Sequence, residues 1–77
     1  MALIRKFERR SMERNSLHRS IRATYTPFEH DGRVSLQIDS YGSETRESPG
    51  KKSQSFQLDR EGATALLAMI RREFALS

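Results

Sequence analysis

The stretch DGRVSLQIDSY (residues 31–41) decides the fold of this chain. From Arg33 onward its polar and apolar side chains alternate, so that Val34, Leu36 and Ile38 share one face. A period of two with a single apolar face predicts a half-buried β-strand. The Asp-Gly pair at the start of the stretch is a strong signal for a two-residue hairpin turn, which predicts an antiparallel strand before it.

Further strands are expected on both sides of this stretch. The strand before the turn is predicted over residues 22–28, and Pro27 near its end indicates a sheet edge or a bulge. After a polar loop at residues 42–52, the alternation of residues 54–58 predicts another strand. Residues 3–7 can form a short first strand.

The C-terminal segment predicts an amphipathic helix from about Asp59 to Phe74. Asp59 is a good N-cap, because its carboxylate can accept hydrogen bonds from the free backbone N–H groups of the first turn. Apolar residues recur at helical spacing and form one stripe, which we expect to pack on the sheet. The members of this stripe are Ala63, Leu66, Leu67, Ile70 and Phe74.

The order of elements, β-β-β-β-α or β-β-β-α, places the chain in the α+β class. Consecutive strands joined by short turns favour an antiparallel sheet with the helix on one face. The other face, from Arg33 to Tyr41, is then left to solvent or to a ligand. A chain of 77 residues buries a thin core, so we expect a homodimer that completes it.

Positive charge is concentrated at the N-terminal end. The net charge is +4, and residues 1–22 hold seven Lys and Arg against two Glu. We therefore divide the chain into a basic N-terminal arm, residues 1–20, and a sheet-and-helix domain, residues 21–77. Such an arm attracts polyanions, while a solvated tail is the alternative interpretation. Within the arm, residues 11–17 form either a helical turn or a loop.

The sequence lacks the usual signals for catalysis and metal binding. It has no cysteine, which excludes disulfides and thiolate metal sites. His18 and His30 have no partner at metal-ligand spacing, and no nucleotide-binding or nucleophile motif is present. We expect a protein that is not an enzyme and has no metal, cofactor or membrane partner. A nuclease that uses Asp39 and Glu47 is a minor alternative.

A group of cations with an interleaved aromatic residue remains to be explained. Lys51 and Lys52 are adjacent, Arg46 lies in the same loop, Arg33 opens the central strand and Tyr41 closes it. Cationic groups bind phosphates and an exposed ring stacks on bases, so this group suits single-stranded nucleic acid. The alternatives are a solvated loop for the lysines and burial of Tyr41 against a dimer partner.

Most of the chain resembles a known family. Residues 31–38, Tyr41, the run Pro49-Gly50-Lys51-Lys52, residues 55–58 and the helix are similar to the single-stranded-DNA-binding transcriptional coactivator family (positive cofactor four) and its bacterial relatives. The resemblance covers about residues 25–74. It implies a curved, four-stranded antiparallel sheet with a C-terminal helix, a homodimer, and binding of unpaired DNA strands in a groove formed by the sheets.

The resemblance also implies roles for single residues. Arg33 matches a basic position on the family's binding sheet, Lys51-Lys52 match the basic residues of its turn, and Tyr41 matches an aromatic at the end of the strand. The chain departs from the family at two positions. Gly42 stands where a second aromatic is usual, and Asp39 replaces a basic residue on the exposed face.

The leading hypothesis is a dimeric, cytoplasmic protein of bacterial or phage origin that binds single-stranded DNA or RNA without strong sequence specificity. Its role would lie in transcription or DNA maintenance. The alternative is a protein-interaction or regulatory module that docks an acidic partner protein. The residues expected to contact nucleic acid are Arg33, Tyr41, Arg46, Lys51, Lys52, Phe28, Arg5, Arg9 and Arg10.

Overall fold

The alternating stretch forms the central hairpin of the fold. In a computed structural model that describes residues 1–42 and 52–77, β2 (Ala23–His30) pairs antiparallel with β3 (Arg33–Tyr41). Asp31 and Gly32 connect them with backbone φ angles of 52° and 73°. Two consecutive positive φ values define the hairpin turn that matches the twist of the strands, so the predicted turn is confirmed.

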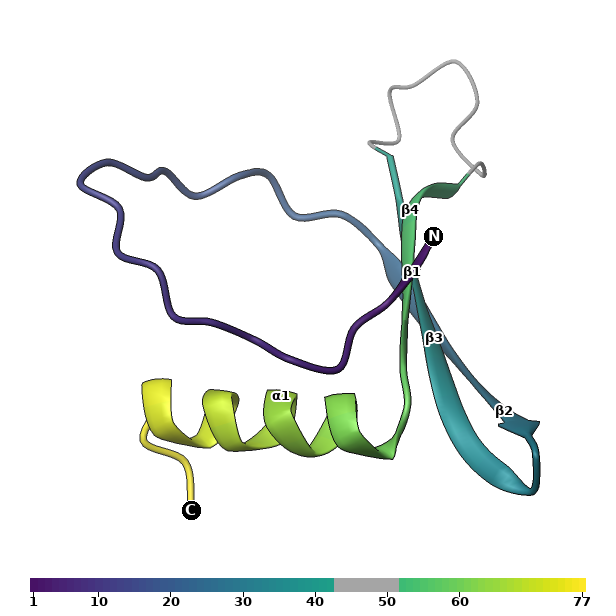
Figure 1. Ribbon diagram of the computed structural model, residues 1–77. Coiled ribbons are helices and arrows are strands. Elements are labelled where there is room, and N and C mark those ends of the chain that lie inside the picture. Colours follow the sequence, from purple (N-terminus) through teal and green to yellow (C-terminus); the bar gives the residue numbers. More distant parts are fainter. Residues whose placement is uncertain (43–51) are drawn as a thin grey trace.

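The sheet has four strands in the order β1-β4-β3-β2, and one helix follows it (Figure 1). β4 (Lys52–Leu58) pairs antiparallel with β3, and β2 forms an edge, as the proline within it predicts. The α+β class is therefore confirmed.

The expectation of a wholly antiparallel, curved sheet is wrong. β1 (Ala2–Leu3) pairs parallel with β4, and the sheet is not strongly curled (Figure 1). The physical reason lies in the connection between β1 and β2. It is a long segment that leaves one edge of the sheet and enters at the opposite edge, so no hairpin turn sets the direction of β1.

The helix α1 (Arg60–Glu73) begins and ends where the sequence predicts. Asp59 is its N-cap, and Asp59 Oδ1 accepts a hydrogen bond of 3.0 Å from the Gly62 N–H. Glu61 in the first turn and arginines in the last turn suit the helix dipole. Phe74 is the C-cap.

The helix does not lie flat on the sheet, contrary to expectation. Figure 1 shows α1 projecting away from the sheet, and its contacts with the strands are mainly with β4. Leu58 is the one apolar side chain that is buried among the described residues, at 2% exposure. Two members of the predicted stripe stay open, since Leu67 is 50% and Phe74 is 72% exposed. The apolar face of the sheet is also open at Tyr25 and Val34.

A different segment covers part of the helix. Residues 4–9, here called the anchor segment, follow β1 and run along α1 (Figure 1). The Ile4 N–H donates to the Gln57 carbonyl oxygen at 2.9 Å. Arg5 Nε lies 2.7 Å from Asp59 Oδ2 and Arg9 Nε lies 3.3 Å from Glu73 Oε2. The two ion pairs therefore hold the anchor segment at the beginning and at the end of the helix.

Glycine at position 62 permits this arrangement. A Cβ atom there would overlap the carbonyl oxygen of Ile4 and would lie 3.2 Å from Leu58 Cδ2. Because Ile4 is held by its backbone hydrogen bond to β4, it cannot move aside without breaking the β1–β4 edge. Gly62 is thus needed for a close approach of two backbones.

Residues 10–22, here called the basic loop, connect the anchor segment to β2. They form no helix and no strand, and every one of their side chains is exposed. Of the two structures expected for residues 11–17, the loop is the one found. Within the described ranges, 1–42 and 52–77, no helix is both long and apolar enough to span a membrane.

Replacing Gly62 by Ala tests the anchor. At an exposed position inside a helix, alanine is more favourable than glycine by about 1 kcal/mol in the free energy of unfolding. Here we expect the overlap with the Ile4 carbonyl to outweigh that gain, with a net loss of about 1–2 kcal/mol in the free energy of unfolding measured in urea. Thr64→Ala, on an exposed position of the same helix, is the control and should be nearly neutral. A Gly62→Ala chain as stable as Thr64→Ala would contradict the close approach.

Candidate nucleic-acid interface

The polar face of the sheet is held together by its own side chains. Cross-strand pairs place Gln37 beside Gln57 and Asp39 beside Ser55. Gln57 Nε2 donates to Gln37 Oε1 at 3.1 Å, and Gln37 Nε2 donates to Asp39 Oδ1 at 3.1 Å. The Ser55 hydroxyl also donates to Asp39 Oδ1. The result is a connected polar network across β3 and β4.

Asp39 is not the open surface charge that the sequence suggests. Its exposed fraction is 3%, and its carboxylate accepts the hydrogen bonds of this network. Buried polar groups are normally satisfied in this way, so Asp39 is explained as a structural centre of the sheet face. The side chains of this network at the middle of the face are two amides, one hydroxyl and the buried Asp39 carboxylate.

Tyr41 lies at one end of this face and is partly covered. Its hydroxyl lies 3.1 Å from Thr24 Oγ1, and the guanidinium carbon of Arg22 lies 4.3 Å from its ring centroid. The cation–π contact places the chain's own arginine over the ring. A base that stacks on this side of Tyr41 must therefore displace Arg22 or stack beside it.

The residues predicted to bind nucleic acid on the sheet lie at two opposite ends of β3. Arg33 opens β3 and Tyr41 closes it, so they lie about 27 Å apart along the strand. Phe28 pairs with Ser35 near the Arg33 end, whereas Lys52 begins β4 opposite Tyr41. The structure thus brings Phe28 near Arg33 and Lys52 near Tyr41, but it does not join the two pairs. The predicted residues Arg46 and Lys51 lie outside the described residues.

The predicted arginines of the N-terminal arm divide into two kinds. Arg5 and Arg9 form ion pairs with the helix and belong to the anchor segment. Arg10 is exposed and forms no ion pair with any described residue. The same holds for Arg14 and Arg19 in the basic loop, which were not among the predicted site residues. The signal that could have found them was the charge excess of residues 1–22.

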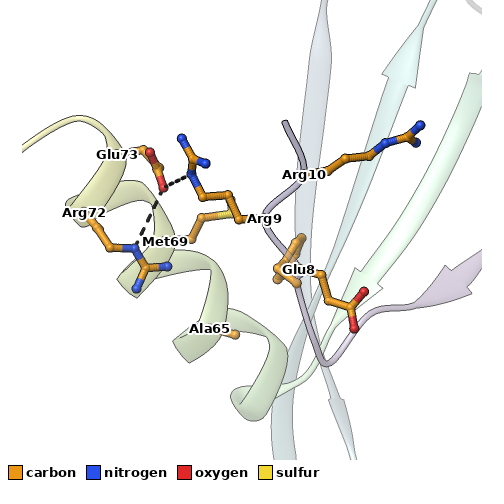
Figure 2. Close-up of a pocket in the computed structure, with 8 residues that line it drawn as sticks. Glu8, Arg9, Arg10, Ala65, Met69, Arg72 and Glu73 are labelled. Atoms are coloured by element: carbon orange, nitrogen blue, oxygen red, sulfur yellow. Dashed lines mark hydrogen bonds and ion pairs between the residues drawn. The ribbon is translucent and has the colours of Figure 1, made fainter. Parts of the chain in front are cut away.

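An open pocket of about 510 Å³ lies between the anchor segment and the helix (Figure 2). Residues 7–10 form one wall, and the helix forms the other with Ala65, Met69, Arg72 and Glu73. Figure 2 shows Arg9 and Arg72 reaching toward Glu73 from the two walls, while the Arg10 side chain points away from the helix. The sequence analysis did not predict this pocket, because its walls lie far apart in the chain.

Asp59 links the anchor segment to the helix electrostatically. The pKa of its carboxyl is lowered from the usual 3.8, first by the hydrogen bond from the Gly62 N–H and then by that from Arg5. The same pairing raises the pKa of Arg5. The charged form of Asp59 is therefore the one that holds both the helix N-terminus and the anchor segment.

No metal centre is found in the part of the chain that the structure describes, where no three His, Asp or Glu side chains gather at ligand distance. Comparison with known proteins finds no matching family model, no similar curated protein and no similar solved structure. The resemblance to the coactivator family therefore rests on the residues quoted for it above.

The lowered pKa of Asp59 predicts a pH dependence of stability. Because the pKa of Asp59 is lower in the folded than in the unfolded protein, its charged carboxylate stabilises the fold above about pH 4. This stabilisation is lost as the pH falls through the pKa that Asp59 has in the folded protein. Asp59→Asn keeps a capping side chain but carries no charge. We expect the wild type to melt above Asp59→Asn near neutral pH, and the difference to shrink as the pH falls below about 4. A difference in melting temperature that stays constant down to acid pH would contradict the lowered pKa of Asp59.

Proposed function

We propose that this chain is a non-catalytic, dimeric nucleic-acid-binding protein that prefers single strands and holds their phosphates mainly with the basic loop. One observation carries the proposal. Arg10, Arg14 and Arg19 lie on an extended, fully exposed segment and form no ion pair with a described residue. Unpaired guanidinium groups on an open backbone attract phosphates strongly and release counterions when they bind them.

The anchor segment supports this role for the basic loop. The backbone hydrogen bond of Ile4 to β4 and the Arg5–Asp59 ion pair fix the anchor segment, and with it the place where the loop leaves the folded domain. At its other end the loop is held by the Arg22 carbonyl, which accepts a hydrogen bond of 3.0 Å from the Tyr41 N–H. A loop fixed at both ends loses less conformational entropy on binding than a free tail, which favours affinity.

The preference for single strands is supported by the aromatic residues at the ends of the sheet. Phe28 and Tyr41 are half-buried, so part of each ring is available to a base. Bases stack on such rings only when they are unpaired, and this stacking does not depend strongly on sequence. A role in transcription or DNA maintenance follows from the resemblance to the coactivator family.

A homodimer is supported by the apolar side chains that remain open. Tyr25 is 73% and Val34 is 60% exposed on one face of the sheet, and Leu67 and Phe74 are open on the helix. A single chain leaves both surfaces in water, where each costs free energy in proportion to its apolar area. A second copy that presents its helix stripe to the open sheet face covers both surfaces at once.

Binding of a labelled single-stranded oligonucleotide at two salt concentrations tests the proposal. We expect binding at low salt that weakens steeply as salt rises. Arg14→Gln/Arg19→Gln should weaken it about tenfold at low salt and reduce the salt dependence by the equivalent of one or two phosphate contacts. Arg60→Gln/Arg71→Gln removes the same charge from exposed helix positions and is the matched control. No binding at low salt, or equal losses in both double variants, would contradict the proposal.

Sedimentation tests the dimer separately. We expect a mass of twice 8.9 kDa at micromolar concentration. Leu67→Asp places a charge on the open stripe and should give the monomer, since burying an unpaired carboxylate in an interface is unfavourable. Ala68→Asp, one residue along on the polar side of the helix, should leave the dimer intact. A wild-type monomer, or a dimer that tolerates Leu67→Asp, would contradict this interface.

A second candidate function is docking on an acidic protein, which the open apolar surfaces and the free arginines also favour. The two functions differ in what a pull-down recovers. Recovery of one protein partner that nuclease treatment does not remove, together with no oligonucleotide binding, would establish the second in place of the first.

A further inference from the structure

The pocket between the anchor segment and the helix holds two arginines around one carboxylate. Arg9 Nε lies 3.3 Å and Arg72 Nε lies 3.9 Å from the same atom, Glu73 Oε2 (Figure 2). The two guanidinium groups come from opposite walls of the pocket. One carboxylate neutralises one of the two positive charges, so this cluster keeps a net charge of +1.

The arginines of this cluster are more accessible than the carboxylate between them. The side chains of Arg9 and Arg72 are 72% and 71% exposed, against 41% for Glu73. The hydrogen bond from Arg9 to Glu73 uses Nε, and the terminal nitrogens of Arg9 donate to no described residue. A guanidinium offers a fork of N–H donors that matches a carboxylate or a phosphate, so most of this donor capacity is open to a second anion.

The negative charge of Glu73 is unfavourable at its position in the helix. It lies in the last turn of α1, where the partial negative charge of the helix dipole disfavours an acidic side chain. Its contacts are with the two arginines, which offset that effect. The Glu73 carboxylate therefore lies between the two guanidinium groups, at a place where another anion can bind.

Beside this cluster the pocket is lined by two further charged residues, Glu8 and Arg10, and by three apolar ones. Phe7 comes from the anchor segment, and Ala65 and Met69 come from the facing side of the helix. The volume of about 510 Å³ falls in the range, about 300–1,000 Å³, that small-molecule pockets have. A pair of guanidinium groups next to an aromatic ring suits a ligand that carries a phosphate and a flat base.

We propose that this pocket is a phosphate subsite for the bound strand, in which one phosphodiester displaces the Glu73 carboxylate from Arg9 and Arg72 and an adjacent base contacts Phe7. The inference rests on the proposed function and deepens it. The exchange replaces one singly charged anion by another, so the tethered carboxylate competes with the strand and lowers its affinity. Removing the carboxylate leaves both guanidinium groups for the phosphate.

The test compares Glu73→Gln with Glu61→Gln, using a labelled single-stranded oligonucleotide as the probe. Both variants raise the net charge by one, and Glu61 lies on α1 away from the pocket. We expect Glu73→Gln to bind about threefold more tightly than the wild type, and clearly more tightly than Glu61→Gln. Its salt dependence should steepen by about 0.7 in logarithmic slope, the value for one more phosphate contact on a single strand.

A double variant separates the subsite from other causes. Glu73→Gln/Arg72→Gln should lose the gain, because the second guanidinium is then absent. Unchanged far-ultraviolet circular dichroism and melting temperature check that each variant is folded. Equal gains in Glu73→Gln and Glu61→Gln, or a gain that persists in the double variant, overturn the subsite while the wild type still binds. Absence of binding by the wild type overturns the proposed function, and this inference with it.

Discussion

The backbone of Ile4 lies directly against Gly62, and the arrangement of this protein depends on that contact. On one side Ile4 is held to β4 through its hydrogen bond with Gln57. On the other side the absence of a side chain at position 62 lets the helix begin next to β1. The Arg5–Asp59 ion pair then fixes the anchor segment at the start of α1, and Arg9 lies beside Glu73 at the end of the helix.

The anchor segment also determines how charge is divided over the surface. Arg5 and Arg9 face carboxylates of the helix, whereas the arginines of the basic loop form no ion pair with a described residue. The polar face of the sheet is centred on the buried Asp39 and offers amides and hydroxyls. In the proposed function, the loop and the adjoining pocket bind phosphate, and the sheet contributes mainly aromatic rings at its ends.

Local patterns were sufficient to predict β2, β3, β4 and α1, whereas the short strand that residues 3–7 could form lies at Ala2–Leu3. Alternation over β3, the Asp-Gly turn and the Asp59 cap each depend on neighbouring residues, so each could be recognised in the sequence. The parallel pairing of β1 could not, because residues more than fifty positions apart decide it. The burial of Asp39 was missed for the same reason, since its donor Ser55 is on another strand.

The roles of the residues at positions 62 and 73 could not be predicted from the helix sequence alone. Gly62 looks like a weak helix residue and Glu73 looks like a surface charge, until the anchor segment is placed against them. The apolar stripe from Ala63 to Phe74 was identified correctly, but its members Leu67 and Phe74 are left exposed. Tertiary contacts between distant segments decide these points, and the charge count of residues 1–22 was the only sign of the basic loop.

The most direct test of this account is an NMR titration of the labelled protein with a single-stranded oligonucleotide. The account predicts that backbone amide shifts change in the basic loop, residues 10–22, and at Arg9, Arg72 and Glu73 around the pocket. The amides of Gln37 and Gln57, at the centre of the polar sheet face, should change little. Shifts confined to that sheet face, with the basic loop unaffected, would contradict the account.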